Sequence, residues 1–129
     1  NQDAHPDLAF YPVGMEGTGP LPQKFAERTR LDNFQHFEEA YHQLVRHLVK
    51  WQLISVDLVD PEGLIKDIIV VGGFTRSPVF LEILKRTAGT RRVLISDHPR
   101  ASALGAAWLV CGKDAYEANA HLLSVTPYV

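Results

Sequence analysis

The sequence predicts an α/β fold in which parallel strands are flanked by helices. Two short segments have the composition of strands, Asp67–Val71 and Arg92–Ser96, and helical patterns alternate with them along the chain. This alternation favours parallel pairing, because a parallel connection needs a crossover long enough to hold a helix. The chain has 129 residues, 46% of them hydrophobic and 22% charged, as expected for about one ordinary globular domain.

The longest predicted helix runs from Asp32, as N-cap, to about Val59. Gln35 follows Asp32 at the spacing of a capping box, and Pro61 comes just after the predicted end. Apolar and aromatic residues recur at alternating spacings of three and four, which predicts one core-facing stripe. Its members are Phe34, Phe37, Tyr41, Leu44, Leu48 and Trp51, and Val45, Val49 and Ile54 widen it.

The segment Asp67–Val71 is β-branched after its first residue and lacks polar alternation. This composition is typical of a strand buried on both faces, as in a parallel sheet covered by helices. The strand ends at Gly72-Gly73, and Ser77 and Pro78 then supply a cap and a first residue for the next helix. Gly89 is the expected end of that helix.

The C-terminal third continues the pattern. After the strand Arg92–Ser96, small residues dominate a predicted helix over Arg100–Val110, and Gly112 ends it. Small side chains predict tight packing of this helix on the sheet, and the apolar neighbours of Cys111 predict a buried, inert thiol. The remaining tail is weakly helical over Tyr116–Leu123.

Composition excludes several classes of function. The formal charge of −2 gives no reason to expect nucleic acid or an anionic membrane as partner. No apolar run is long enough to span a bilayer, and the first residues lack the features of a signal peptide, so we expect a cytoplasmic protein. The chain does not begin with methionine, which fits an excised fragment.

The charges are distributed unevenly. Residues 76–100 carry six basic and two acidic side chains, a net of +4. They form either a positive field for an anionic ligand or a solvated helix face. Lys85 and Arg86 favour the second interpretation, because cations at a helix C-terminus complement its dipole.

Neither of two candidate metal sites is convincing. The first is three histidines on the long helix, whose spacings do not stack them on one face: His36, His42 and His47. The second is an acidic cluster that is better explained as a solvated loop: Asp57, Asp60 and Glu62. We therefore predict no metal site in this chain.

The most informative motif is a buried strand that ends in two glycines and a helix N-terminus, Val70–Pro78. Ligands of open α/β sheets bind beyond the carboxyl ends of strands, and glycine lets a flat ligand approach the backbone. The amides and dipole of a helix N-terminus favour negative charge. Some thirty residues later follows Ala103-Leu104-Gly105-Ala106-Ala107.

These motifs carry a family resemblance. Asp67–Val110 resembles the C-terminal nucleotide-binding subdomain of the actin, sugar-kinase and Hsp70 superfamily, whose adenosine motif the diglycine matches. Leu8–Val110 is similar to the C-terminal part of FGGY-type carbohydrate kinases, especially rhamnulokinase-like members. The helix at Tyr41–Val49, the strand Arg92–Ser96 and the motif Ala103–Ala107 support this choice.

The resemblance implies part of an actin-like ATPase domain with a ribonuclease H-like fold. Its division would be an irregular segment 1–31, a nucleotide-binding subdomain 32–112 and a tail 113–129. The implied ligands are ATP, or ADP, and Mg²⁺. The family's phosphate-binding turns, aspartate base and sugar site would lie in a missing N-terminal lobe, so no catalytic residue is assigned and the metal would be held mainly elsewhere. A homo-oligomer is left open.

Carried over by position, the resemblance places Gly72, Gly73 and Phe74 as the wall against the adenine and ribose of ATP. Ser77 falls near the base, although it is also the expected helix cap. Arg100 departs from the family, which has an acidic or amide residue there. The chain alone is expected to be inactive.

Two alternatives stay open. One is a fragment of an Hsp70-like chaperone ATPase, because the turn from Val71 to Pro78 is close to the diglycine turn of those proteins. The other is a stand-alone nucleotide-binding module without chemistry.

Overall fold

The computed structural model describes Gly17 and residues 31–129. The predicted irregular segment 1–31 therefore lies almost wholly outside the described residues. The chain divides into two compact units, 1–64 and 65–129. This division differs from the ranges 32–112 and 113–129 expected from the resemblance, which stay a prediction.

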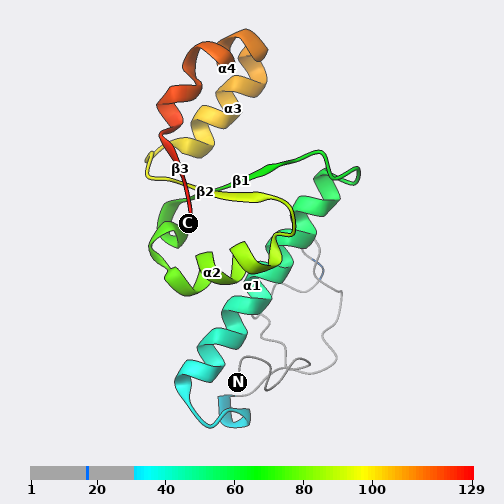
Figure 1. Ribbon diagram of the computed structural model, residues 1–129, viewed down its shortest axis with the longest axis vertical. Helices are drawn as coiled ribbons and strands as arrows, with labels where there is room; N and C mark the ends of the chain where they lie inside the picture. Colours follow the sequence, from blue (N-terminus) through cyan, green and yellow to red (C-terminus); the bar gives the residue numbers. More distant parts are fainter. Residues whose placement is uncertain (1–16, 18–30) are drawn as a thin grey trace. The chain divides into compact units, whose positions relative to one another are not determined.

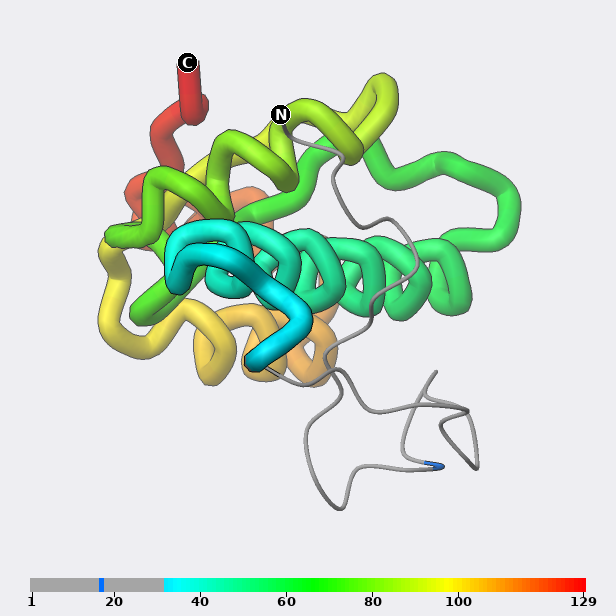
Figure 2. Tube along the Cα trace, turned by 90° about the horizontal axis from the view of Figure 1, so that it is seen from below, coloured from blue at the N-terminus to red at the C-terminus, as the bar shows by residue number. Residues whose placement is uncertain are grey.

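The first unit contains a short 3-10 helix, η1 (Leu31–Asn33), and the long helix α1 (Phe37–Val59). Figure 2 shows α1 as one uninterrupted coil, from cyan to green. The predicted N-cap at Asp32 is wrong: Asp32 lies inside η1, and His36 occupies the cap position without a side-chain hydrogen bond. The predicted end at Val59 is confirmed. Asp60 follows it, and its Oδ1 accepts from the backbone N of Leu64 at 2.7 Å.

The buried positions of α1 match the predicted stripe only in part, at Val45 and Val49. Phe37 is 76% exposed and Tyr41 37% exposed, and the two rings stack on each other with centroids 6.4 Å apart. The buried side chains are mostly smaller: Ala40, Gln43, Val45 and Val49. The predicted stripe included the largest apolar residues of the helix. In the first turn, two of these residues, Phe37 and Tyr41, stack on each other at the surface.

The second unit is built on a three-stranded mixed sheet flanked by helices (Figure 1). Strands β1 (Asp67–Val71) and β2 (Arg92–Ser96) have the predicted bounds, and their parallel pairing is confirmed. A third strand, β3 (Val125–Pro127), pairs antiparallel with the other side of β2. It was not predicted, because a three-residue strand ending in proline gives almost no periodic signal.

The predicted burial of β1 on both faces is not observed. Val70 is the one buried residue of this strand, and Ile69 is 39% exposed. Parallel partners share a face, so Ile69 lies on the same face as Leu94 and Val70 on the same face as Ile95. β1 is an edge strand of this sheet, which explains why its burial is incomplete.

Helix α2 (Pro78–Thr87) follows β1 and packs against β2. It buries Phe80, Leu81 and Leu84. Its predicted start is confirmed: the Oγ of Ser77 accepts from the backbone N of Phe80 at 3.4 Å. Ala88 and Gly89 end the helix, and Gly89 adopts a positive φ of 68°.

Between β2 and β3 the chain forms α3 (Ala101–Cys111), α4 (Lys113–Asn119) and a 3-10 helix, η3 (Ala120–Leu123). Figure 1 shows α3 and α4 as a hairpin, and Gly112 makes its turn with a φ of 85°. The rings of Trp108 and Tyr116 meet edge-to-face across it, with centroids 5.0 Å apart.

Two expectations for α3 are corrected. The helix packs against α4, and most of its residues are not buried: Leu109 and Val110 are each 88% exposed. Cys111 is exposed as well, although a buried thiol was predicted. Apolar neighbours in sequence do not bury a residue when those neighbours are themselves exposed, as Leu109 and Val110 are. Among the described residues, no helix combines the length and hydropathy that crossing a bilayer requires.

Candidate functional site

A cleft of about 660 Å³ lies at the carboxyl ends of the two parallel strands. Its floor includes Val71 and Ser96, which are register partners and the last residues of β1 and β2. One wall is the turn after β1, and the other is the loop after β2 with the start of α3. The lining residues beyond the floor are Gly72, Gly73, Thr75, Arg76, Asp97, His98, Pro99, Arg100, Ala101, Ser102 and Ala103. The volume falls in the range of small-molecule and cofactor sites.

The first wall begins with the predicted diglycine, in a 3-10 turn called η2 (Gly72–Arg76). Gly72 has a φ of 72°, a conformation that glycine adopts without strain. Gly73 does not have a positive φ, and a Cβ built on it would meet no atom within 4 Å. The hydroxyl of Thr75 donates to the carbonyl of Gly72 at 2.7 Å and fixes the turn. The backbone at Gly73 is therefore open to the cleft.

Two of the four predicted binding residues do not line the cleft. The ring of Phe74 stacks on Phe80, with centroids 4.4 Å apart and planes 25° from parallel. Ser77 uses its hydroxyl to cap α2. Of the predicted wall, Gly72 and Gly73 line the cleft, whereas the binding role of Phe74, which is 46% exposed, stays a prediction.

The second wall was not predicted as part of the site. It is anchored by the floor residue Ser96, which is 1% exposed. Its hydroxyl donates to the carbonyl of Leu123 and accepts from the backbone N of His98 at 3.2 Å. Ser96 therefore fixes the loop after β2 and holds η3 beside it. The position of this loop at the carboxyl end of a second parallel strand was the signal in the sequence that could have identified it.

The start of α3 completes this wall. The backbone N of Ala101 donates to the carbonyl of His98 at 3.3 Å, and that of Arg100 donates to His98 Nδ1 at 3.2 Å. Arg100 occupies the N-cap position and provides no side-chain cap. Ser102 and Ala103, which come next, line the cleft at the positive end of the helix dipole.

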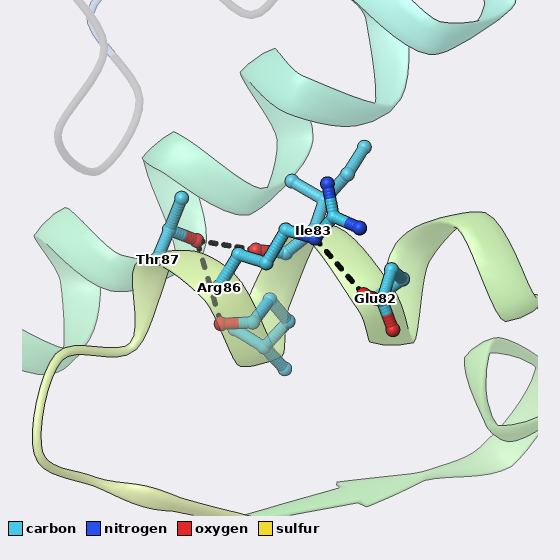
Figure 3. A network of polar contacts seen from close by, with 5 residues as sticks. Glu82, Ile83, Arg86 and Thr87 are labelled. Carbon is cyan, nitrogen blue, oxygen red and sulfur yellow. Dashed lines mark hydrogen bonds and ion pairs between the residues drawn. The ribbon is translucent and has the colours of Figure 1, made fainter.

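Some basic residues of 76–100 fit a solvated helix face, and others fit a positive field for an anionic ligand. At the end of α2, Arg86 Nε donates to Glu82 Oε1 at 2.9 Å, and the Thr87 hydroxyl donates to the carbonyl of Ile83 at 2.7 Å (Figure 3). Lys85 lies 5.7 Å from the ring centre of Tyr128. These contacts belong to the helix surface and not to a ligand site.

Arg92 also has a structural partner. It forms a two-pronged ion pair with Asp67 across β1 and β2, at 2.7 and 2.8 Å. These hydrogen bonds lower the pKa of Asp67 and raise the pKa of Arg92. Arg76 and Arg100 differ from these residues, because both line the cleft. The positive-field interpretation therefore applies to these two residues.

The candidate metal groups give no site in the described part of the chain, where no three His, Cys, Asp or Glu side chains come together. Asp60 is 7% exposed and accepts a hydrogen bond at the end of α1. Burial, and then the charges of Lys50 and Arg46, lower the pKa of His47. Gln43 Nε2 lies 3.3 Å from its Nε2. Asp60, Gln43 and His47 therefore make contacts within α1 or at its end.

Comparison with protein-family models, with curated proteins and with solved structures finds no match to this chain. The resemblance to FGGY-type kinases therefore rests on the sequence motifs alone.

Proposed function

We propose that this chain supplies the ATP-binding, C-terminal part of an FGGY-type carbohydrate kinase, within an actin-like ATPase domain. One observation carries the proposal. The diglycine turn and the start of the small-residue helix, which the resemblance singles out, border the same cleft at the carboxyl ends of β1 and β2.

The cleft suits a nucleotide in shape and charge. Gly73 leaves its backbone uncovered, so a ribose or an adenine can approach it without meeting a Cβ. Arg76 and Arg100 bring positive charge to the same cleft, and the amides at the start of α3 add donors. Guanidinium groups and backbone amides are the partners that phosphates prefer in proteins.

The cleft does not suit independent phosphoryl transfer. Asp97 is the one carboxylate among its described lining residues. Mg²⁺ in such enzymes is held by one or two carboxylates together with the substrate phosphates, so the remaining metal contacts would come from outside this chain. The base and the sugar site would also come from the N-terminal lobe. The chain alone is therefore expected to bind nucleotide weakly and not to phosphorylate a sugar.

An Hsp70-like ATPase is the second candidate. Thr75 and Arg76, which carry that likeness together with the glycines, also line the cleft. Both candidates use the same turn for adenosine, and they differ in what activates ATP turnover.

Calorimetric titration of the full-length natural protein with ADP tests the nucleotide site. Gly73→Val adds a branched side chain at a residue that lines the cleft, where a Cβ meets no protein atom within 4 Å, and is expected to weaken ADP binding at least tenfold. Gly105→Ala is the matched control: Gly105 also has room for a Cβ, but it does not line the cleft. If the Gly73 variant binds ADP as tightly as the parent, the cleft is not the nucleotide site.

Turnover separates the two candidates. The full-length natural protein is incubated with Mg-ATP and a panel of sugars and polyols, and ADP release is measured. Release that requires one sugar, together with a phosphorylated sugar as product, supports the kinase. Release that ignores sugars but increases with unfolded peptides supports the chaperone ATPase. Failure to bind any adenine nucleotide contradicts both.

A further inference from the structure

The hydroxyl of Ser96 connects the floor of the cleft to the segment 124–129. Ser96 is the last residue of β2, lines the cleft and is almost completely buried. Its Oγ accepts from the backbone N of His98 at 3.2 Å and donates to the carbonyl of Leu123. An N–H can only donate and a carbonyl can only accept, so the one hydroxyl proton goes to Leu123. The two hydrogen bonds therefore form together and do not compete.

The hydrogen bond to His98 determines where the second wall of the cleft lies. Residues 97–100 lead from Ser96 to α3, and all four line the cleft. The carbonyl of His98 accepts from the backbone N of Ala101, the first residue of α3, at 3.3 Å. A displacement of His98 therefore also moves the start of α3. The position of the whole wall depends on the hydroxyl that holds the amide of His98.

The hydrogen bond to Leu123 determines how the chain enters β3. Ser124, the next residue, has a φ of 49°, a left-handed conformation that residues other than glycine keep only where contacts hold them. Val125 then faces Ser96 across the antiparallel β2–β3 ladder (Figure 1). Of the described residues, none in 121–129 lines the cleft. The segment can therefore affect a ligand only through residues such as Ser96.

Burial makes this hydroxyl difficult to replace. Water has little access to the site, so it cannot readily take over either hydrogen bond if the hydroxyl is removed. Loss of the hydroxyl would release the loop after β2 on one side and the turn before β3 on the other. The position of the wall and the order of the segment 124–129 should therefore change together.

We infer that Ser96 is a positioning residue for the nucleotide, which makes the second wall of the cleft depend on the segment 124–129. The inference rests on the proposed function, since a nucleotide in the cleft is the ligand that the wall would position. Linkage makes the dependence mutual. The factor by which the ordered segment strengthens ADP binding is also the factor by which bound ADP favours the ordered segment.

Hydrogen exchange in the unmodified full-length natural protein, with and without saturating ADP, tests this linkage. The amides of Ser124 and Tyr128 both donate to backbone carbonyls. ADP should slow their exchange about fivefold, the factor that corresponds to the net contribution of one neutral hydrogen bond. The amide of Ala88, bonded to the carbonyl of Leu84 at the end of α2, measures the general stabilisation that any ligand gives. The slowing at Ser124 and Tyr128 is counted beyond that of Ala88.

Two substitutions at Ser96 distinguish hydrogen bonding from packing. Ser96→Ala should bind ADP about fivefold more weakly in calorimetric titration, and ADP should no longer slow exchange in the segment 124–129 beyond its effect on Ala88. Ser96→Cys fills nearly the same space with a weak donor and acceptor, and it should behave like the alanine variant.

Ser55→Ala is the matched control for these variants. Ser55 also donates its hydroxyl to a backbone carbonyl, that of Trp51 at 2.9 Å, but it lies on α1 and does not line the cleft. This variant should keep both the ADP affinity and the slowed exchange of the parent. Thermal unfolding checks that each variant is folded, and if a Ser96 variant is not, the exchange measurement on the unmodified protein decides.

The outcomes separate this inference from the nucleotide site. If the parent binds ADP and Gly73→Val weakens that binding, but ADP slows Ser124 and Tyr128 no more than Ala88, the role of Ser96 is refuted and the nucleotide site stands. Behaviour of Ser96→Cys like that of the parent would also refute it, since the side chain would then act by packing alone. If the parent does not bind ADP, both proposals fail.

Discussion

Gly72 and Gly73 are adjacent, but their backbones have different requirements. Gly72 adopts a φ of 72°, which an L-residue reaches only with strain, whereas Gly73 has an ordinary backbone and free space where a Cβ would stand. Gly72 is therefore needed for the turn itself. Gly73 is needed only if a ligand approaches it.

This difference predicts opposite effects on stability. Gly72→Ala should lower the free energy of unfolding by about 1 kcal/mol, because alanine is strained at positive φ. Gly73→Ala should leave it unchanged or raise it slightly, because alanine restricts the unfolded chain. Urea unfolding of the two variants beside the parent measures both effects. Equal destabilisation by the two substitutions would contradict the described turn.

The ion pair of Asp67 and Arg92 predicts a pH dependence. Its hydrogen bonds lower the pKa of Asp67 below the ordinary value of 3.8, so the folded state favours the ionised carboxylate. The stabilisation is present above pH 3.8 and is lost as the pH falls through the lowered pKa of the folded state. Asp67→Asn should remove this part of the acid sensitivity.

The measurement is the urea midpoint between pH 6 and pH 2.5. The midpoint of Asp67→Asn should be lower than that of the parent at pH 6, and the two should converge at the acid end. Asp114→Asn, at an exposed carboxylate of α4, controls for the loss of one charge. Since the side chain of Arg92 is 72% exposed and that of Asp67 is 35% exposed, solvent reaches the pair and added salt should reduce the difference. Parallel curves for Asp67→Asn and the parent would argue against the pair.

Among the elements, α2 was predicted most completely. Its cap, first proline and terminating glycine are all local signals, and each is found in the structure. The cap predicts that its removal lowers the stability of the protein by a measurable amount. Ser77→Ala removes the acceptor of the Phe80 amide and should lower the free energy of unfolding by about 1 kcal/mol.

Hydrogen exchange localises this effect. The amide of Phe80 should lose protection when Ser77 is replaced by alanine. Ser102→Ala, at an exposed serine in the first turn of α3, should leave α2 unchanged. Unaltered protection of Phe80 in the Ser77 variant would indicate that the long 3.4 Å hydrogen bond contributes nothing.

Helices α1 and α3 show that local sequence signals predict where a helix ends better than which of its residues are buried. Their existence and C-terminal ends were predicted to within about one residue, because periodicity, glycine and proline act locally. Their buried faces were predicted only in part. A helix exposes or buries a residue such as Phe37 or Leu109 according to which element lies beside it, and composition does not specify that neighbour.

At the scale of the second unit, β3 ties the end of the chain to the sheet. It pairs with β2, and the backbone N of Tyr128 donates to the carbonyl of Val93 at 2.9 Å. The hydroxyl of Ser96 binds the carbonyl of Leu123 just before this strand. The chain leaves β2 to form the helical hairpin and then returns as β3 to pair with β2. Both ends of the hairpin are therefore connected to the sheet.

Removing residues 125–129 tests this closure. β2 would become an edge strand, and the amides that face β3 should exchange faster with solvent. We expect a lower urea midpoint and faster exchange in β2, with the amides in the middle of α1 unaffected. A truncated chain with the same midpoint and the same protection of β2 would refute a structural role for β3.

The sequence by itself determined the local features of this protein. Strand bounds, the cap of α2 and the helix-ending glycines follow from the backbone preferences of a few neighbouring residues, so no distant partner was needed to predict them. The tertiary structure decided which of these features meet. Parallel pairing of β1 and β2 brings the ends Val71 and Ser96 together, and with them Gly73 and His98, which are far apart in the chain. It also stacked the ring of Phe74 on that of Phe80, and Phe74 is not among the residues that line the cleft. Burial and site geometry depend on contacts between distant segments, and local preferences do not encode those contacts.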